Sequence, residues 1–500
     1  MHHSAEPVLS IQGLSFRYPP RPGGAAGSGA LVLDGLALDI PAAATAVLLG
    51  RADAGKTTLA RIVAGLVPRF TGGGIAGSVK VRGRDVRPVA PYDLVETIGL
   101  VAQDSEEQLI TTRCDTEAAF ALESLGLSRA EMRRRVEESL EKVGLGGFAQ
   151  RNPSTLSGGE KKRLLVACLL AVRPDLWILD EALGELDFEW KTRVLDIASG
   201  ASATVLLLES RWSPLAEKRG TSFFLVDGGR VRAAAPDARD ASMGAALLAA
   251  GIRTAQRPAP ASLPVDGCLR ASGLRFSFPG APGFGLLVEH LELRFGEICA
   301  LVGRNGSGKS TLARILCGLL HPQEGTVGFG GPGGGRPARA EELLARIGYL
   351  FQNPDLQIFL PTVREELGLG LRALRLGREE AEGRISEAAA RFDLPDLDAP
   401  PALLSYGARR RLQAATYFLL SRDLLILDEI DSGLSYREIE TLVDALASRV
   451  PGLVLITHDL ALARSACHRI VVMDQGRIAV DSPSHDFDPA GEWAAQGTAR

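Results

Sequence analysis

Short, continuously apolar runs recur along the chain and alternate with longer segments of helical periodicity. The runs are TAVLLG (45–50), LWILD (176–180) and TVLLLE (204–209) in the first half, and ICALVG (298–303), LLILD (424–428) and GLVLI (452–456) in the second. A run of five or six apolar residues is typical of a strand that is buried on both faces of a sheet. Helical segments between such strands predict an α/β fold with a mainly parallel sheet.

The same order of motifs occurs twice along the chain. Four pairs mark the repeat: Lys56 and Lys309, Gln103 and Gln352, Ser157 and Ser405, and Asp180 and Asp428. Self-similarity of this kind indicates two homologous domains. We predict a first domain at 1–232, a second at 267–500 and, between them, an Ala-, Pro- and Gly-rich linker at 233–266 with one short helix at 241–250.

Composition and charge narrow the class of protein. The chain has 500 residues and a formal net charge of −4, whereas a dedicated nucleic-acid binder is usually basic, so no nucleic acid is expected as a partner. The six cysteines are widely spaced without a C-x-x-C pair, which is typical of reduced thiols in a cytosolic protein. No signal peptide is expected at the first residues. The longest apolar stretch, 164–172, is about half of a membrane span and predicts a buried helix.

Two glycine-rich loops carry the first candidate chemistry. GRADAGKTT (50–58) and GRNGSGKST (303–311) each follow an apolar strand and open a helix, KTTLARIVAGL or KSTLARILCGL, which is the context of a phosphate-binding P-loop. Backbone N–H groups and the helix N-terminus would hold the phosphates, Lys309 would reach the β- and γ-phosphates, and Ser310 would bind Mg²⁺. The candidate nucleotide contacts are Gly303, Asn305, Gly306, Ser307, Gly308, Lys309, Ser310, Thr311, Gly50, Gly55, Lys56, Thr57 and Thr58.

Paired acids end one strand in each half. Asp180 and Asp428 are predicted to bind Mg²⁺ or its water, and the next residues, Glu181 and Glu429, to polarise the attacking water. TLSGGEKKR (155–163) and LLSYGARRR (403–411) each place a small polar turn before a helix, which suits a second anion-binding helix terminus. We expect the basic clusters 161–163 and 409–411 to form a solvated face and not a nucleic-acid surface.

With the two glutamines and THD (457–459), this set of motifs resembles the nucleotide-binding subunits of ATP-binding cassette proteins over nearly the whole chain. The resemblance implies two tandem P-loop NTPase domains, each with a mainly parallel core sheet, an antiparallel β subdomain and a helical subdomain. It also implies an internal pseudo-dimer with ATP and Mg²⁺ as cofactors, each ATP lying between one P-loop and the other domain's signature (LSGGE or LSYGA). The resemblance further implies that Tyr18 and Phe278 stack on adenine and that the signature residues and their neighbours contact nucleotide, namely Ser157, Gly158, Gly159, Asp187, Ser405 and Gly407. It places Thr57, Gln103 and Gln352 at the metal. It implies a catalytic role for His458, Gln352, Glu429 and Glu181.

Departures from the family pattern gather on one of the two implied sites. They are Asp53 in the first P-loop, Ser210 at the position of His458, Tyr406 and Ala408 in the second signature, and Ser435 at the position of Asp187. An imidazole beside the γ-phosphate would stabilise the transition state, and losing such a group lowers rates by about 10²–10³. We therefore predict that the first P-loop binds ATP and turns it over slowly, while the second carries hydrolysis.

The segment after each glutamine indicates the kind of transporter. QDSEEQLI (103–110) and QNPDLQIF (352–359) resemble energy-coupling-factor ATPases and the related cobalt and nickel importers. The resemblance implies a peripheral subunit on the cytoplasmic face of the cell membrane that powers uptake of a vitamin or transition-metal ion. Its implied partners are a transmembrane scaffold protein and a membrane substrate-binding component. In that family this stretch lies at the groove where the coupling helices of the transmembrane protein dock. The residues that the resemblance places at or near this docking groove are Glu107, Gln108, Ile110, Asp355, Gln357, Phe359 and Pro361. For each of them, ordinary subdomain packing is the alternative.

Two other functions fit a tandem pair of this length. One is a fused sugar-importer ATPase that works with a soluble binding protein, and the other is a non-transport cassette pair that acts on ribosomes. The segment after the glutamine favours the energy-coupling-factor type over the sugar importer. The linker is rich in Ala, Pro and Gly, whereas ribosome-acting pairs carry a long charged helical linker.

Overall fold

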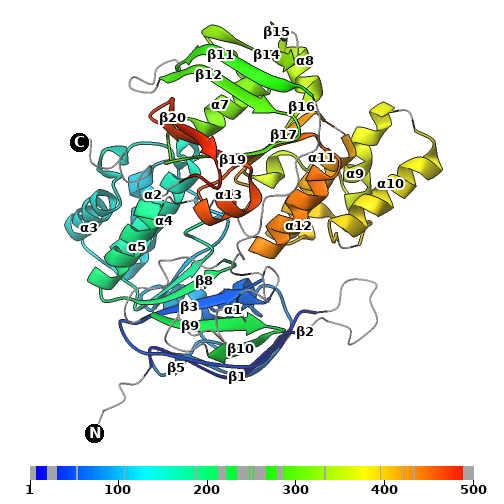
Figure 1. Cartoon of the computed structure of the whole chain (residues 1–500). Coiled ribbons are helices and arrows are strands. Elements are labelled where there is room, and N and C mark those ends of the chain that lie inside the picture. Colours follow the sequence, from blue (N-terminus) through cyan, green and yellow to red (C-terminus); the bar gives the residue numbers. More distant parts are fainter. Residues whose placement is uncertain are drawn as a thin grey trace. The chain divides into compact units, whose positions relative to one another are not determined.

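The computed structural model divides into two compact units, Met1–Arg253 and Thr254–Arg500, which are described separately (Figure 1). The structure describes residues 7–19, 31–51, 54–105, 107–184, 186, 188–211, 221–233, 247, 252, 266–278, 285–331, 334–374, 376–394, 396–420, 422–431 and 434–487. Apart from Leu247, the short helix expected at 241–250 lies outside these residues. Leu247 and Ile252 are fully buried in a core cluster of the first unit, so this part of the expected linker packs on the first unit.

The first unit contains a six-stranded sheet of order β10-β9-β3-β8-β7-β6. Its strands are β3 (Thr45–Gly50), β6 (Ile98–Val101), β7 (Leu176–Asp180), β8 (Thr204–Glu209), β9 (Thr221–Asp227) and β10 (Arg230–Ala233), all parallel except β10. An antiparallel sheet, β2-β1-β4-β5, comprises β1 (Leu9–Arg17), β2 (Leu31–Ile40), β4 (Gly74–Val81) and β5 (Arg84–Asp85). The described α-helices are α1 (Lys56–Val63), α2 (Cys114–Phe120), α3 (Arg129–Lys142), α4 (Gly158–Val172) and α5 (Phe188–Gly200).

The second unit repeats this plan, with sheet orders β16-β17-β18-β13-β19-β20 and β12-β11-β14-β15. The strands are β11 (Cys268–Phe276), β12 (Leu286–Arg294), β13 (Ile298–Gly303), β14 (Glu324–Gly331), β15 (Gly334–Pro337), β16 (Ile347–Leu350), β17 (Leu424–Asp428), β18 (Gly452–Ile456), β19 (Arg469–Asp474) and β20 (Arg477–Pro483). The α-helices are α7 (Lys309–Leu316), α8 (Ala340–Arg346), α9 (Val363–Leu371), α10 (Arg378–Arg391), α11 (Tyr406–Leu420), α12 (Tyr436–Ala447) and α13 (Leu460–Ala466). The equal strand orders confirm the predicted α/β repeat.

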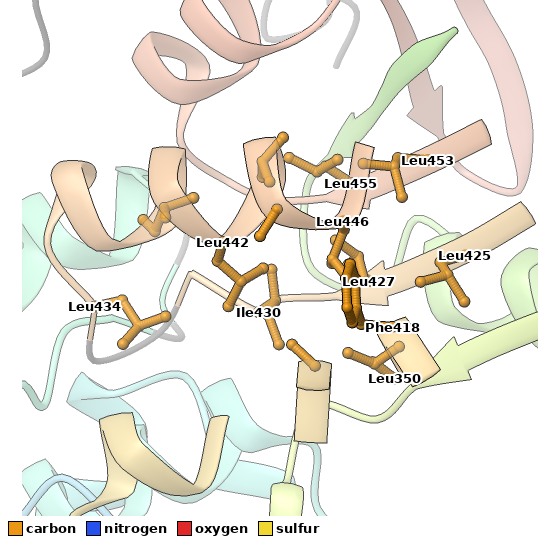
Figure 2. Packing of buried hydrophobic residues seen from close by; sticks show 14 of the residues in the cluster. Leu350, Phe418, Leu425, Leu427, Ile430, Leu434, Leu442, Leu446, Leu453 and Leu455 are labelled. Atoms are coloured by element: carbon orange, nitrogen blue, oxygen red, sulfur yellow. The ribbon is translucent and has the colours of Figure 1, made fainter. Parts of the chain in front are cut away.

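Strand β17 shows why the core strands are continuously apolar. Leu425 and Leu427 pack with Phe418 of α11 in one buried cluster (Figure 2). The alternate residues, Leu424 and Ile426, belong to the cluster on the other face of the sheet. Because successive side chains of a strand point to opposite faces, a strand covered on both sides favours apolar residues throughout, and the one polar residue of β17, Asp428, lies at its end.

Helix α4 confirms that the apolar stretch 164–172 is a buried helix and not a membrane span. Among the residues that the structure describes, no helix is long and apolar enough to cross a membrane.

Truncating Phe418 is expected to destabilise the second unit. The ring is 1% exposed, so Phe418→Ala would leave a cavity and cost about 3–5 kcal/mol. Scanning calorimetry of the whole chain should show a lower midpoint for one transition. Leu403→Ala is the control because Leu403 is 75% exposed, and an equal shift in both variants would contradict the expectation.

Candidate nucleotide sites

Each glycine-rich loop connects a core strand to a helix, β3 to α1 and β13 to α7. The residue before each helix, Gly55 or Gly308, has a φ of 94° or 101°, a left-handed conformation that favours glycine. At Gly55 a β-carbon would also lie 2.9 Å from Leu33 Cδ2. The predicted P-loop context is therefore present in both units.

The P-loop lysines fold back onto their own loops. Lys309 Nζ donates to the carbonyl oxygens of Gly303 (2.9 Å) and Arg304 (3.0 Å). Lys56 Nζ donates to the corresponding oxygens of Gly50 (2.8 Å) and Arg51 (2.9 Å). Both ammonium groups are thus held within the loops that would receive phosphate. Asp53 lies outside the described residues.

In the second unit, five of the predicted residues meet at the end of β17. Ser310 Oγ donates to Asp428 Oδ1 at 3.3 Å. Glu429 Oε1 lies 3.0 Å from His458 Nε2, and Glu429 Oε2 accepts a hydrogen bond from Gln352 Nε2 at 2.7 Å. The structure therefore brings together the expected metal ligands and the expected catalytic groups.

The pKa values of Asp428 and Glu429 are shifted in opposite directions. Burial, followed by the charge of Glu429, raises the pKa of Asp428 above its usual range. Burial also disfavours the charged form of Glu429, but His458 and Lys309 together outweigh burial, and the pKa of Glu429 is lowered. Glu429 is therefore ionised at neutral pH and able to accept a proton from water.

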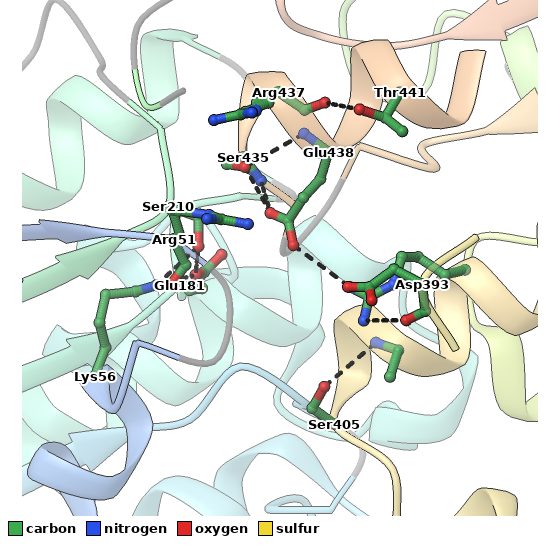
Figure 3. A network of polar contacts seen from close by, with 12 residues as sticks. Arg51, Lys56, Glu181, Ser210, Asp393, Ser405, Ser435, Arg437, Glu438 and Thr441 are labelled. Atoms are coloured by element: carbon green, nitrogen blue, oxygen red, sulfur yellow. Dashed lines mark hydrogen bonds and ion pairs between the residues drawn. The ribbon is translucent and has the colours of Figure 1, made fainter. Parts of the chain in front are cut away.

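The corresponding residues of the first unit are arranged differently. Lys56 Nζ donates to Ser210 Oγ at 2.9 Å and lies 3.4 Å from Glu181 Oε1, and Ser210 donates to the same carboxylate (Figure 3). No hydrogen bond joins the described side chains of Gln103 and Glu181, unlike Gln352 and Glu429. In this arrangement Glu181 pairs with the P-loop lysine and no histidine takes the position of Ser210.

The strand register supports the matching of Ser210 with His458. Asp180 of β7 pairs with Leu208 of β8, and Asp428 of β17 pairs with Ile456 of β18. Ser210 and His458 each lie two residues beyond that partner. Ser210 and His458 therefore occupy equivalent positions in the two sheets, and the two sites differ there.

The environment of Asp180 suits the role of a metal ligand that acts together with a bound phosphate. Its Oδ1 atom is buried without a hydrogen-bond partner among the described residues, and burial, followed by the charge of Glu181, raises its pKa to about 6. The described residues contain no group of three His, Cys, Asp or Glu side chains that could cage a metal. This donor set suits Mg²⁺, which usually takes one or two carboxylates, waters and substrate phosphates. When bound, Mg²⁺ would neutralise charge on the phosphates.

Comparison with known proteins identifies the family. The profile of the family described as ABC transporter matches residues 33–184 and 289–432. The chain belongs to the ABC transporter family. Two proteins that carry the provisional name of ABC transporter ATP-binding protein are each 31% identical, one from Methanosarcina acetivorans (98% of this chain, 88% of its own) and one from Streptomyces coelicolor (90% of each). The solved structure of CbiO1 from Clostridium perfringens, described as part of the ABC transporter complex CbiONQ, is 26% identical with a TM-score of 0.41, covering 47% of this chain and 96% of its own.

The two units are therefore ATP-binding cassettes, and the protein is the ATP-hydrolysing subunit of an ABC transporter. The two signatures start the helices α4 and α11. Ser157 caps α4 in a reciprocal pair with Glu160, and Ser405 Oγ accepts a hydrogen bond from Ala408 N at 3.3 Å. Gly158, Gly159 and Gly407 lie in the first turns of these helices, and their contacts with nucleotide stay predictions.

Ser435 has a local role that the sequence comparison did not reveal. It caps α12 through a reciprocal pair with Glu438, and it is fully buried (Figure 3). Serine and aspartate are both strong helix caps, so the exchange preserves the helix start while removing a charge. Asp187, its counterpart, lies outside the described residues.

The basic clusters after the signatures are not entirely solvated, so that expectation was wrong for their central residues. Lys162 is 1% exposed and Arg410 is fully buried. Lys162 Nζ donates to the carbonyl oxygens of Ala102 (2.9 Å) and Gln103, whereas Arg410 donates to Phe351 O at 3.0 Å. Both side chains therefore tie the signature helix to the loop that carries the glutamine.

The two aromatic residues expected at adenine lie beside the antiparallel sheets. Tyr18 is half-buried, and its hydroxyl lies 3.1 Å from Thr58 Oγ1 at the first P-loop. Phe278 is 40% exposed and packs edge to face on Phe276. Phe276, Ser277 and Gly306 help to line a pocket of about 690 Å³, which is large enough for part of a nucleotide. Stacking on adenine stays a prediction.

Proposed function

We propose that this ABC ATPase powers an importer of the energy-coupling-factor type, taking up a vitamin or transition-metal ion. It would act at the cytoplasmic face of the membrane with a transmembrane scaffold and a membrane substrate-binding component. The observation that supports this most is the conformation of the loop after Gln103 and Gln352, which has the same construction in both cassettes.

The loop is tied inward by a glutamine side chain. Gln357 accepts a hydrogen bond from Phe351 N (2.9 Å) and donates to Tyr349 O (2.8 Å). Gln108 does the same with Ala102 N (2.7 Å) and Leu100 O (3.1 Å). For these two residues, the structure favours the packing alternative over direct contact with a partner.

A buried carboxylate fixes the outer part of the same loop. Glu366 Oε2 accepts hydrogen bonds from Phe359 N (2.9 Å) and Leu360 N (2.8 Å), while the Phe359 side chain is 71% exposed. Glu117 holds Ile110 N at 3.1 Å, and Ile110 is 64% exposed. An exposed apolar side chain on a fixed backbone suits docking of a membrane protein's helix. Of the other groove candidates, Asp355 pairs with Arg409 at 3.2 Å, and Glu107 and Pro361 are exposed.

Phe359→Asp is expected to reduce recovery of the membrane partners by about 10-fold or more, because a charge would replace an apolar anchor. The measurement is affinity purification of the tagged chain from detergent-solubilised membranes, with partners identified by mass spectrometry. Phe70→Asp is the control, since Phe70 is 72% exposed on another loop.

The identity of the co-purified partners decides between an energy-coupling-factor importer, a sugar importer and a cassette pair that acts on ribosomes. We expect a multi-span scaffold and a small integral membrane protein, and loss of cobalt, nickel or vitamin uptake when the chain is deleted. Recovery of a sugar permease with a soluble binding protein, or of ribosomal subunits, would overturn the proposal.

The proposal includes unequal ATP sites. We propose that the second P-loop, completed by the first signature as the family resemblance implies, carries hydrolysis, and that the first P-loop binds ATP and turns it over slowly. The contacts of Glu429 with His458 and Gln352, against the pairing of Glu181 with Lys56, support this assignment.

A further inference from the structure

We infer that Tyr406 and Arg410 of α11 together position Gln352 and Glu429 of their own cassette. On this interpretation, the tyrosine in LSYGA has a constructive role at the intact site and is not simply a defect of the other site. The inference rests on the proposed assignment of hydrolysis to the second P-loop.

Helix α11 holds the main chain on both sides of the Gln352 side chain. Tyr406 donates its hydroxyl hydrogen to Gln352 O at 3.3 Å. Arg410 Nη1 donates to Phe351 O at 3.0 Å, and Arg410 Nη2 donates to the Tyr406 hydroxyl oxygen at 2.9 Å. Gln413 Nε2 of the same helix also donates to Phe351 O, at 3.1 Å, whereas Gln352 O accepts from Tyr406. Three residues of α11 therefore fix two successive carbonyl groups of the loop.

The same arginine reaches the catalytic acid. Arg410 Nη2 donates to the main-chain oxygen of Glu429 at 3.2 Å, while the Gln352 side chain donates to the Glu429 carboxylate at 2.7 Å. Arg410 is fully buried, so solvent does not screen or replace these contacts. A shift of α11 would therefore move Gln352 and Glu429 relative to each other, and small displacements of reacting groups reduce rates strongly.

The first cassette holds the two loop carbonyl groups with one side chain, which makes no hydrogen bond to Glu181 among the described residues. Lys162, at the position of Arg410, donates to both carbonyl groups, Ala102 O and Gln103 O. The residue at the position of Tyr406 is Gly158, which has no side chain to contribute. A flexible ammonium group can serve two oxygens, whereas the planar guanidinium of Arg410 serves Phe351 O and Glu429 O and leaves Gln352 O to the tyrosine. Arg with Tyr in the second cassette and Lys with Gly in the first are thus two ways of holding the same pair of loop carbonyl groups.

A double-mutant cycle tests this pairing, with steady-state ATP hydrolysis and nucleotide binding measured on the whole chain. Tyr406→Gly and Arg410→Lys are each expected to lower kcat about 10-fold while KM for ATP changes less than about 2-fold. The double variant, which has the residues of Gly158 and Lys162 at these two positions, is expected to lose clearly less than the product of the two single losses. Tyr406→Phe, which keeps the ring, should also lower kcat, and Tyr92→Phe is the control because Tyr92 is 77% exposed.

Two results would overturn the inference. One is a Tyr406→Gly chain that keeps or gains turnover, as expected if the tyrosine only weakened the other site. The other is a double variant whose loss equals the product of the single losses. Lys309→Ala in the same assay shows which proposal has failed. If turnover survives Lys309→Ala, the assignment of hydrolysis to the second P-loop is wrong. If turnover is lost in Lys309→Ala but the double-mutant cycle shows no coupling, only the role of Tyr406 and Arg410 is wrong.

Discussion

Glu429→Gln is expected to lower steady-state ATP hydrolysis by about 10²–10³-fold, because the amide cannot perform the role proposed for Glu429, accepting a proton from the attacking water. The wild-type carboxylate lies 3.0 Å from His458 Nε2 and has a lowered pKa, so it is a charged acceptor at neutral pH. The amide would keep the size of the side chain and its place in the protein interior. ATP binding should therefore persist while turnover is lost, which separate binding and turnover measurements will show.

Glu181→Gln is the matched change in the other cassette and is expected to leave more than half of the turnover. Glu181 accepts a hydrogen bond from Ser210 and lies 3.4 Å from Lys56 Nζ, so its carboxylate is already engaged by the P-loop cation. If Glu181→Gln alone abolished turnover, or Glu429→Gln spared it, the proposed division of labour would be wrong.

Lys309→Ala is expected to reduce kcat/KM for ATP by about 10²–10³-fold, since it removes the cation that we predict to meet the β- and γ-phosphates. Lys309 is 5% exposed and anchored at two loop carbonyl groups, so its loss would also leave those oxygens without their donor. ATP hydrolysis at several ATP concentrations and equilibrium binding of a fluorescent ATP analogue would measure both effects.

Lys56→Ala provides the comparison within the same chain. We expect it to weaken binding of one nucleotide and to change turnover less than about 10-fold. A Lys309→Ala chain with near-normal hydrolysis, or equal losses in both variants, would show that the two P-loops share the reaction.

The strands that lead into the P-loops were predictable from the sequence because nearly all of their residues are buried. Strands β3 and β13 coincide with the apolar runs 45–50 and 298–303. Helix α1 begins at Lys56 as expected but ends at Val63, before the expected end of the run at Leu66. Gly65 has a φ of 73°, a left-handed conformation typical of the residue just beyond a helix.

The charge of a run of three basic residues predicts a solvated face, but the central cation of each run, Lys162 or Arg410, is buried. On α4, Gly159, Lys162 and Val166 lie at helical spacing and are all buried. On α11, Gly407, Arg410 and Ala414 show the same pattern. Residues three and seven positions apart share a helix face, so the spacing carried a signal that the central basic residue points inward. The partners that make its burial tolerable, backbone carbonyl groups of a distant loop, have no signature in the sequence.

The loop glutamines and Ser435 show another limit of the sequence. A motif such as Q-x-x-x-x-Q does not reveal which polar side chain turns inward, because the answer depends on backbone groups elsewhere in the fold. Gln357 serves Phe351 N and Tyr349 O, and it could not be told apart from a docking residue beforehand. The sequence shows that Ser435 lacks the charge of Asp187, whereas its helix-capping hydrogen bond is visible only in the fold.

Glu117 and Glu366 hold the outer loops through backbone N–H groups, which every residue except proline possesses. The amino acid displayed at the tip can therefore change without altering the path of the loop. Ile110 and Phe359 differ in this way already, so one chain offers two unlike apolar tips on one common framework. If the proposed membrane scaffold meets both tips, it needs no internal symmetry, and its contact regions could diverge independently of the machinery that hydrolyses ATP.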